Sequence, residues 1–184
     1  MAYTLYDATI PAFVNGLNTM LILLTKAEAY AADKGVDIST LLQARLAEDM
    51  HPLTFQYYVA TETAMKTVTR IQGIEPEVYE NNLKVASDLR ARVEHTIAIV
   101  KAADKSVFEA RPDVIVPLPI DILKEPLQMK ARDYVGAYGI PNFYFHVQTA
   151  YCILRAQGVP LSKADFLGSS MGPFFEQHHK QQRR

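Results

Sequence analysis

The chain has 184 residues, of which 49% are hydrophobic and 21% charged, and its formal net charge at pH 7 is −1. A chain of this length buries roughly 70% of the surface that its unfolded form exposes, which suits one hydrophobic core. The near-neutral charge excludes the strongly basic surface of a dedicated nucleic-acid-binding protein. The single cysteine, Cys152, excludes a disulfide framework and a cysteine-based zinc site. We therefore expect one domain over residues 1–172 and a polar, mobile tail over residues 173–184.

The apolar residues do not form a membrane-spanning segment. A run such as residues 20–24 stops far short of the ~20 apolar residues that cross a bilayer. The first thirty residues also lack the charged start, apolar core and small-residue cleavage site of a secretory signal. We therefore expect a cytoplasmic protein that has neither a membrane nor a nucleic acid as a partner.

The first element that the sequence predicts is a long helix over residues 5–34, where apolar residues recur every three or four positions. Gly35 ends this pattern, as glycine commonly does at a helix C-terminus. A short helix with Ser39 at its N-cap follows. The second long helix is predicted over residues 52–73, because proline is tolerated at a first helical position and Gly73 closes the apolar stripe.

The third long helix is predicted over residues 79–103, from another apolar stripe with opposite charges four residues apart on its wet side. Residues 104–139 break the helical pattern with four prolines, and the runs 114–116 and 127–130 are typical of strands. The fourth long helix covers residues 141–157. We predict an all-α, up-down-up-down four-helix bundle with a short extra helix and a small β-hairpin in the third connection.

Polar residues interrupt the apolar stripes of two of these helices. His146 and Asn142, one turn apart, face inward on the fourth helix, and Gln56 faces inward on the second. A buried imidazole or amide without a hydrogen-bond partner costs on the order of 1–3 kcal/mol. If both helices begin at the same end of the bundle, these residues and His51 converge on one polar site beneath the 104–139 connection.

Three roles for His146 stay open at this point. It is a core histidine bonded to Gln56 or to a tyrosine hydroxyl, a catalytic or ligand-binding residue, or a metal ligand. Histidine ligands on one helix usually lie four residues apart, but the positions four before and four after His146 hold Asn142 and Ala150. We therefore predict neither a metal ligand set nor a cofactor.

The predicted function is to bind or transform a small molecule in this polar site. Ten tyrosines are available to line a pocket for a flat ligand, so we expect a carbonyl-bearing or phenolic molecule of specialised metabolism. In an enzyme His146 is the acid/base. The residues expected to bind the ligand are His51, Gln56, Asn142, Tyr144 and Tyr151. The alternatives are a non-catalytic stress or interaction protein that forms a homodimer, and a metal-dependent hydrolase or transferase.

Several runs of residues are similar to those of a known family. They are Leu5-Tyr6-Asp7 with Thr9-Ile10-Pro11, Leu46 with Asp49-Met50 and Pro52-Leu53, Gln56 with Ala60 and Ala64, Pro141–Val147 with Thr149-Ala150-Tyr151 and Ile153-Leu154-Arg155, Gly158–Leu161 and Lys163–Gly168. From Leu5 to Gly168 the chain resembles an uncharacterised family of unknown function placed among the DinB/YfiT-like four-helix bundles.

The resemblance implies a DinB-like bundle, often dimeric, in a superfamily that includes metal-dependent hydrolases and thiol transferases. In metal-binding relatives one histidine lies near the start of the second helix and two lie one turn apart on the fourth. His51 stands at the first of these positions and His146 at one of the others. The remaining position carries no histidine in this chain, which counts against metal dependence. We also expect a homodimer.

Overall fold

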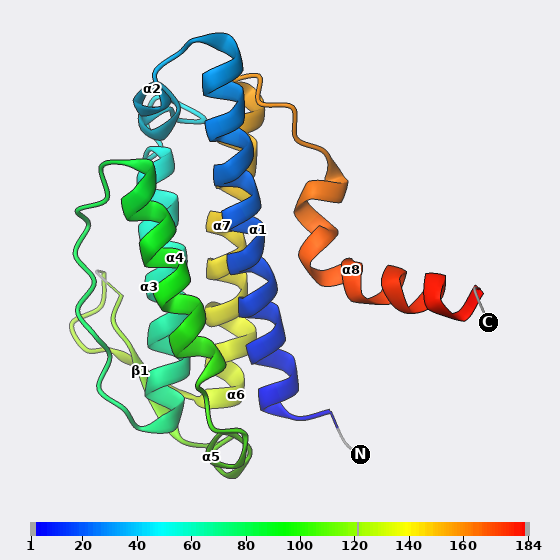
Figure 1. Cartoon of the computed structure of the whole chain (residues 1–184). Helices are drawn as coiled ribbons and strands as arrows, with labels where there is room; N and C mark the ends of the chain where they lie inside the picture. Colours follow the sequence, from blue (N-terminus) through cyan, green and yellow to red (C-terminus); the bar gives the residue numbers. More distant parts are fainter. Residues whose placement is uncertain (1–2, 121, 183–184) are drawn as a thin grey trace.

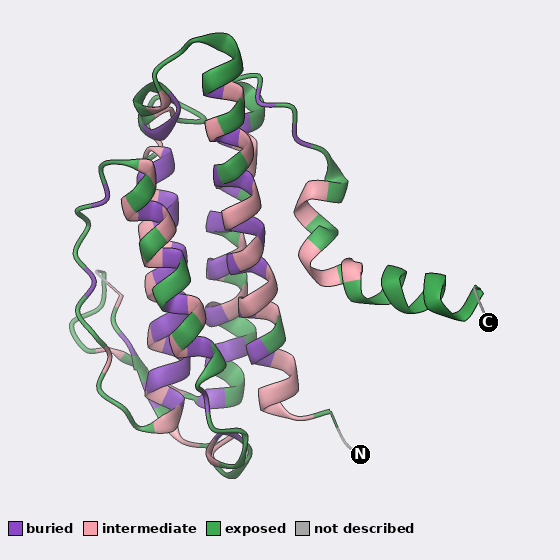
Figure 2. Cartoon of the chain, in the orientation of Figure 1, coloured by how far each residue is buried: buried purple, intermediate pink, exposed green. Residues whose placement is uncertain are grey.

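Four helices run side by side in the computed structural model, which describes residues 3–120 and 122–182 (Figure 1). They are α1 (Leu5–Lys34), α3 (Leu53–Gln72), α4 (Ala86–Lys101) and α7 (Ile140–Ala156). α1 and α3 each pack against both α4 and α7, so α1 and α3 lie diagonally across the bundle. Figure 2 shows the buried positions on the facing sides of these helices. The predicted all-α four-helix bundle is therefore confirmed.

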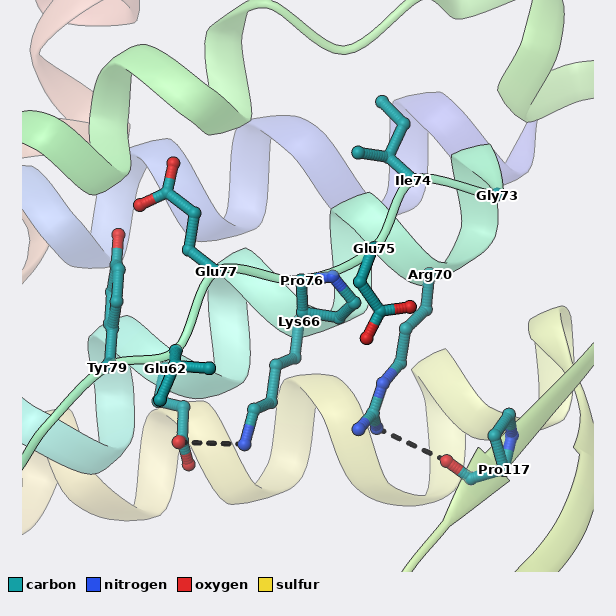
Figure 3. A pocket seen from close by; sticks show the side chains of 11 residues that line it. Glu62, Lys66, Arg70, Gly73, Ile74, Glu75, Pro76, Glu77, Tyr79 and Pro117 are labelled. Carbon is teal, nitrogen blue, oxygen red and sulfur yellow. Dashed lines mark hydrogen bonds and ion pairs between the residues drawn. The ribbon is translucent and has the colours of Figure 1, made fainter.

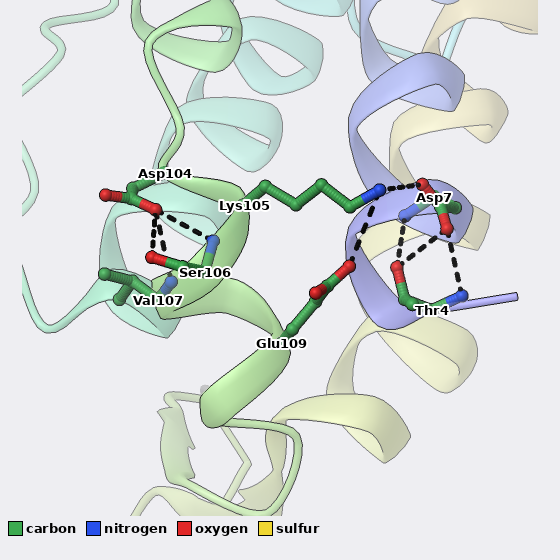
Figure 4. Close-up of polar contacts among 7 residues, drawn as sticks. All are labelled: Thr4, Asp7, Asp104, Lys105, Ser106, Val107 and Glu109. Carbon is green, nitrogen blue, oxygen red and sulfur yellow. Dashed lines mark hydrogen bonds and ion pairs between the residues drawn. The ribbon is translucent and has the colours of Figure 1, made fainter. Parts of the chain in front are cut away.

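The N-terminus of α1 is held by reciprocal hydrogen bonds (Figure 4). The side chain of Thr4 accepts from the backbone N–H of Asp7, whose carboxylate accepts from the backbone N–H of Thr4. Lys105, at the start of α5 (Lys105–Ala110), forms an ion pair with Asp7 at 3.1 Å. The hydrogen bonds from Thr4 and Lys105 lower the pKa of Asp7. This contact ties the start of α1 to the end of the bundle where α4 finishes.

α1 is long and apolar enough by composition alone to cross a membrane. Half of its most apolar stretch is buried inside the protein. Phe13, Leu17 and Leu24 have no exposed surface and belong to the hydrophobic core. The bundle core therefore accounts for the apolar character of this helix.

The shorter elements lie in the connections. They are α2 (Ile38–Gln43), α5, β1 (Ile115–Leu118), β2 (Leu127–Lys130), α6 (Ala131–Tyr134) and the π-helical turn η1 (Val135–Gly139). The predicted short helix and β-hairpin are confirmed, with β1 and β2 antiparallel. Asp37 caps α2 in place of Ser39, because its carboxylate accepts from the Ser39 backbone N–H at 2.8 Å.

The direction of the third bundle helix differs from the prediction. Residues 74–85 contain no helix and run back along the outside of the bundle, so α4 begins only at Ala86 (Figure 1). The C-terminal ends of α3 and α4 therefore lie together, where the Asp104 backbone N–H donates to Oε1 of Gln72 at 2.8 Å. The four helices consequently run up-down-down-up, and not up-down-up-down.

Tyr79 and Leu83 explain this difference. Both are buried, at the spacing of four residues that is typical of a helix, but they pack onto the bundle from the irregular connection. The Tyr79 hydroxyl lies 3.1 Å from Oγ1 of Thr96 on α4, and the guanidinium of Arg92 lies over the Tyr79 ring. Spacing reports which residues are buried, and it does not report the backbone conformation that buries them.

The last described element is α8 (Lys163–Gln182), which packs against α1 through its first turns and then leaves the bundle (Figure 1). Lys26 forms an ion pair with Asp165 at 2.7 Å, and Oγ1 of Thr19 donates to the Phe166 carbonyl. The tail expected over residues 173–184 is thus helical as far as Gln182, and the two residues after it lie outside the described ones. Its mobility stays a prediction.

Candidate functional site

The side chains of His146 and Gln56 meet between α7 and α3. Nδ1 of His146 lies 2.8 Å from Oε1 of Gln56. Nε2 of Gln56 donates to the backbone carbonyls of His51 at 3.0 Å and Pro52 at 3.4 Å. Because carbonyls only accept, the amide nitrogen of Gln56 faces them and its oxygen faces His146. Nδ1 of His146 must therefore carry the proton, and Nε2 has a lone pair.

The environment of His146 keeps its ring neutral. Burial, with a smaller contribution from nearby His51, lowers the pKa of His146 from 6.5 to about 4. Within the described residues, Nε2 has no hydrogen-bond partner, although it is not among the polar atoms sealed from solvent. At neutral pH the ring is therefore neutral, and Nε2 can accept a hydrogen bond.

Aromatic rings surround this pair of residues. The exposed ring of His51 stacks on Phe55 with ring centroids 3.9 Å apart, and Phe55 lies edge-on to His146. Phe145, which is 58% exposed, meets the His146 ring at 90°. Flat apolar surface and one polar acceptor therefore occur together at this position.

Asn142 lies one turn before His146 on the same face of α7, as the sequence predicts. Its amide nitrogen donates to Oγ1 of Thr63 at 2.9 Å. Because α3 and α7 are antiparallel, a residue that precedes His146 on α7 lies opposite a residue that follows Gln56 on α3. Thr63 is such a residue, two turns after Gln56. Asn142 is thus held by α3 next to the hydrogen-bonded side chains of His146 and Gln56, and its amide nitrogen has a partner within the protein.

Tyr144 and Tyr151 are not brought to this site. The Tyr144 hydroxyl donates to the Ala12 carbonyl of α1 at 3.0 Å, and burial raises the pKa of Tyr144. The ring of Tyr151 packs edge-on against Phe166 of α8. Both tyrosines face α1 and α8, because positions 144 and 151 point away from position 146 around a helix. They serve the packing of these helices.

The residues around His146 do not fit the metal centre that the fold family implies. The bond from Nδ1 of His146 to Gln56 is compatible with ligation through Nε2, but the position one turn earlier on α7 holds Asn142, whose amide nitrogen donates to Thr63. Across residues 3–120 and 122–182, no three His, Cys, Asp or Glu residues gather closely enough to hold a metal ion. His51 and His146 supply two of the three protein ligands that a catalytic zinc ion requires.

The connection over residues 104–139 covers a different part of the bundle from the one predicted. It lies over the end of α3, whereas His146 faces the start of α3 (Figure 1). The physical reason is that helical turns begin at Ala131, so His146 lies in the middle of one helical stretch that runs antiparallel to α3. The predicted convergence beneath this connection required α3 and the helix of His146 to begin at the same end of the bundle, and they begin at opposite ends.

A cleft that the sequence analysis missed lies beneath this connection (Figure 3). It consists of two adjoining cavities, of about 480 and 290 Å³, which share Glu62, Lys66 and Arg70 of α3. Residues 73–79 form one wall, and the β-hairpin with α6 and η1 forms another. The spacing of four between the charged residues aligns them on one face. A charged helix face is usually solvated, so this spacing alone does not indicate a cleft.

The π-helical turn η1 shapes this cleft. A Cβ atom at Gly139 would lie 3.1 Å from Oγ1 of Thr67, so glycine lets this turn approach α3 closely. Tyr138, in the same turn, lines the smaller cavity, and burial raises its pKa. Isolated π-helical turns occur frequently at functional sites.

Comparison with known proteins shows which solved structure the bundle resembles and to which family the chain belongs. The chain is similar to the crystal structure of a DinB family member protein from Shewanella denitrificans, with 31% sequence identity and a TM-score of 0.80. The similarity covers 89% of this chain and 91% of the other. The bundle is therefore DinB-like. Residues 5–167 match the family described as Domain of unknown function (DUF1993), and the chain belongs to this family. None of the curated proteins matches it.

Proposed function

We propose that the protein binds a small phenolic molecule beside His146, with the phenol O–H donating to Nε2. The observation that carries this proposal is the hydrogen bond of Gln56 to Nδ1, which leaves Nε2 as an acceptor. A carbonyl oxygen would need a donor at this position, and the low pKa of His146 disfavours the protonated ring. Of the two ligand classes expected from the sequence, the phenolic one therefore suits the site better.

The surroundings of His146 support a flat ligand. The rings of His51, Phe55 and Phe145 offer faces and edges for stacking. A catalytic role, in which Nε2 of His146 takes the ligand's proton as a general base, requires the phenolate left beside the ring to raise the pKa of His146, since an opposite charge favours the imidazolium. The imidazolium that forms keeps its Nδ1–H bond to Gln56, which strengthens because the donor is now charged. Such a step would belong to specialised metabolism in the cytoplasm.

Binding of 4-nitrophenol and of its O-methyl ether, 4-nitroanisole, tests this proposal. At a pH below the pKa of 4-nitrophenol, where the phenol keeps its proton, we expect the wild type to bind 4-nitrophenol at least tenfold more tightly than 4-nitroanisole, since only the phenol donates a hydrogen bond. A His146→Phe variant is expected to lose this preference, whereas the control His95→Phe, on the exposed face of α4, keeps it. Titration calorimetry measures the affinities.

Melting temperatures of the same variants separate a binding role from a structural one. A His146→Phe variant that melts near the wild type and loses the preference for the phenol supports the proposal. Equal affinities of the wild type for both probes contradict it. A large drop in melting temperature without any binding of 4-nitrophenol to the wild type indicates a core histidine instead.

We propose, as a second candidate function, an interaction protein in which α8 joins two copies of the chain. Four apolar side chains at helical spacing are exposed along α8: Leu167, Met171, Phe174 and Phe175. Three of them, Leu167, Met171 and Phe175, border an apolar cavity of about 480 Å³ on that helix. Because a twofold dimer uses the same patch on both subunits, pairing of two α8 helices covers both apolar faces at once.

Sedimentation analysis of variants in α8 tests this second candidate. The wild type is expected to sediment as a dimer at micromolar concentration. Phe174→Glu combined with Phe175→Glu is expected to give a monomer, because two carboxylates would be buried without partners. The matched control Gln181→Glu adds a charge on the polar part of the same helix and leaves the dimer intact. A monomeric wild type, or a dimer that survives both glutamates, would show that α8 does not join the copies.

A further inference from the structure

We propose that the cleft between α3, residues 73–79 and the β-hairpin binds a small molecule bearing one carboxylate, which Arg70 and Lys66 hold. This site is separate from His146, which faces the other end of α3. The volume of the larger cavity, about 480 Å³, falls within the range of small-molecule sites. The inference therefore does not depend on the proposal for His146.

Arg70 is the side chain that points to an anionic ligand. Its Nη1 donates to the Pro117 carbonyl of β1 at 3.2 Å, which holds the guanidinium at the cleft (Figure 3). Within the described part of the chain this is its only hydrogen bond, and no carboxylate lies within 4.0 Å of it. A guanidinium has five N–H donors in a planar fork that matches a carboxylate. The remaining donors of Arg70 are available to a ligand.

Lys66 supplies the second positive charge. It lies one turn before Arg70 on α3 and forms an ion pair with Glu62 at 2.7 Å. The Tyr58 hydroxyl also donates to Glu62, which holds that carboxylate on the side of Lys66 away from Arg70. Lys66 can therefore keep Glu62 as a partner while one of its other N–H groups reaches a ligand beside Arg70.

The acidic residues of the cleft decide between kinds of anion. Glu62, Glu75 and Glu77 line the larger cavity with Lys66 and Arg70, so its formal charges number three negative and two positive. A phosphate with two negative charges would be repelled by these carboxylates, whereas a single carboxylate needs only the fork of Arg70. Of the two kinds of anion, these charges therefore repel a monoanion less than a dianion, and the attraction for its carboxylate comes from Arg70 and Lys66 alone.

The walls of the cleft suit an apolar body behind the carboxylate. Apolar side chains line it from two segments of the chain: Ile74, Pro76 and Val78 from the first, and Pro117, Leu118 and Pro119 from the second. The half-buried hydroxyl of Tyr138 lines the adjoining cavity, and burial keeps it protonated as a donor. A ring-sized carboxylic acid matches this combination of one cationic fork, apolar walls and a neutral hydroxyl.

Benzoate, its neutral isostere benzyl alcohol and inorganic phosphate are the probes for this site. We expect benzoate to bind the wild type at least tenfold more tightly than either of the other two, by titration calorimetry. Arg70→Gln is expected to weaken benzoate binding about tenfold or more. Arg70→Lys is expected to fall between, because it keeps the charge and loses the planar fork.

Two control variants make the result specific. Arg132→Gln removes an exposed arginine that pairs with Asp113 outside the cleft, and it is expected to leave benzoate binding unchanged. His146→Phe is likewise expected to have no effect on benzoate. The proposal is overturned if benzoate does not bind the wild type, if phosphate binds more tightly than benzoate, or if Arg70→Gln binds benzoate as the wild type does. Melting temperatures verify that each variant is folded.

Discussion

Replacing Phe143 by alanine is expected to lower the free energy of unfolding by about 3–5 kcal/mol. Phe143 is fully buried in α7, and its ring packs edge-on against Phe13 of α1 with centroids 5.0 Å apart. The same ring covers Gly16, where a Cβ atom would collide with it. Truncation thus removes the ring contact with Phe13 and leaves a cavity between two bundle helices. Urea unfolding measures the change.

Two further variants test whether the loss of stability comes from the buried contacts of Phe143. Phe145→Ala, two residues away but 58% exposed, is expected to cost less than about 1 kcal/mol. Gly16→Ala is expected to destabilise the wild type through its collision with Phe143 and to be tolerated in the Phe143→Ala background. If the two substitutions add without interaction, the Phe143 ring does not close on Gly16 as described.

The stability of the protein is expected to fall by about 3 kcal/mol between pH 6.5 and pH 4 because of His146. The folded protein holds this ring neutral down to a pKa of about 4, whereas the unfolded chain protonates it near 6.5. In this window the unfolded state therefore binds more protons, and acid favours unfolding. Above pH 6.5 the contribution of His146 is complete, and below pH 4 it is lost.

The control for the pH effect is His146→Gln, which removes the titrating group and retains hydrogen-bonding capacity toward Gln56. Its stability is expected to be nearly flat from pH 6.5 to about 4.5. The carboxylates whose pKa is lowered, such as Asp165 beside Lys26, lose their contribution nearer their ordinary value of 3.8. Equal slopes for variant and wild type over this range of pH, in urea unfolding, would show that His146 titrates normally.

Much of the candidate site was within reach of sequence reasoning because it depends on local pattern. A polar residue within an apolar stripe must find a partner, and Gln56, one of the partners considered for His146, lies 2.8 Å from its Nδ1. Tyr144 and Tyr151 were grouped with them from residue type alone. Their positions around α7 direct them to α1 and α8 instead.

The cleft around Arg70 depends on contacts that no local pattern contains. Its walls come from residues 73–79, from the hairpin and from η1, which approach α3 from distant parts of the chain. Charged residues on one helix face have the same spacing in the sequence whether that face is exposed to solvent or covered by other segments. The hydrogen bond of Arg70 to the Pro117 carbonyl, 47 residues later, distinguishes the two cases.

By itself the sequence determined the four helices of the bundle and the hairpin, because apolar spacing and glycine or proline at helix ends are local properties. The similarity of its residue runs to a known family, and not this spacing, indicated that the bundle is DinB-like. Only the tertiary structure decided the direction of α4 and which part of the bundle the 104–139 connection covers. Tyr79 and Leu83 illustrate the reason, since burial on one side gives the same spacing in a helix and in an irregular connection. Helix direction depends on how far such a connection travels, and that distance is set by packing between segments remote in sequence.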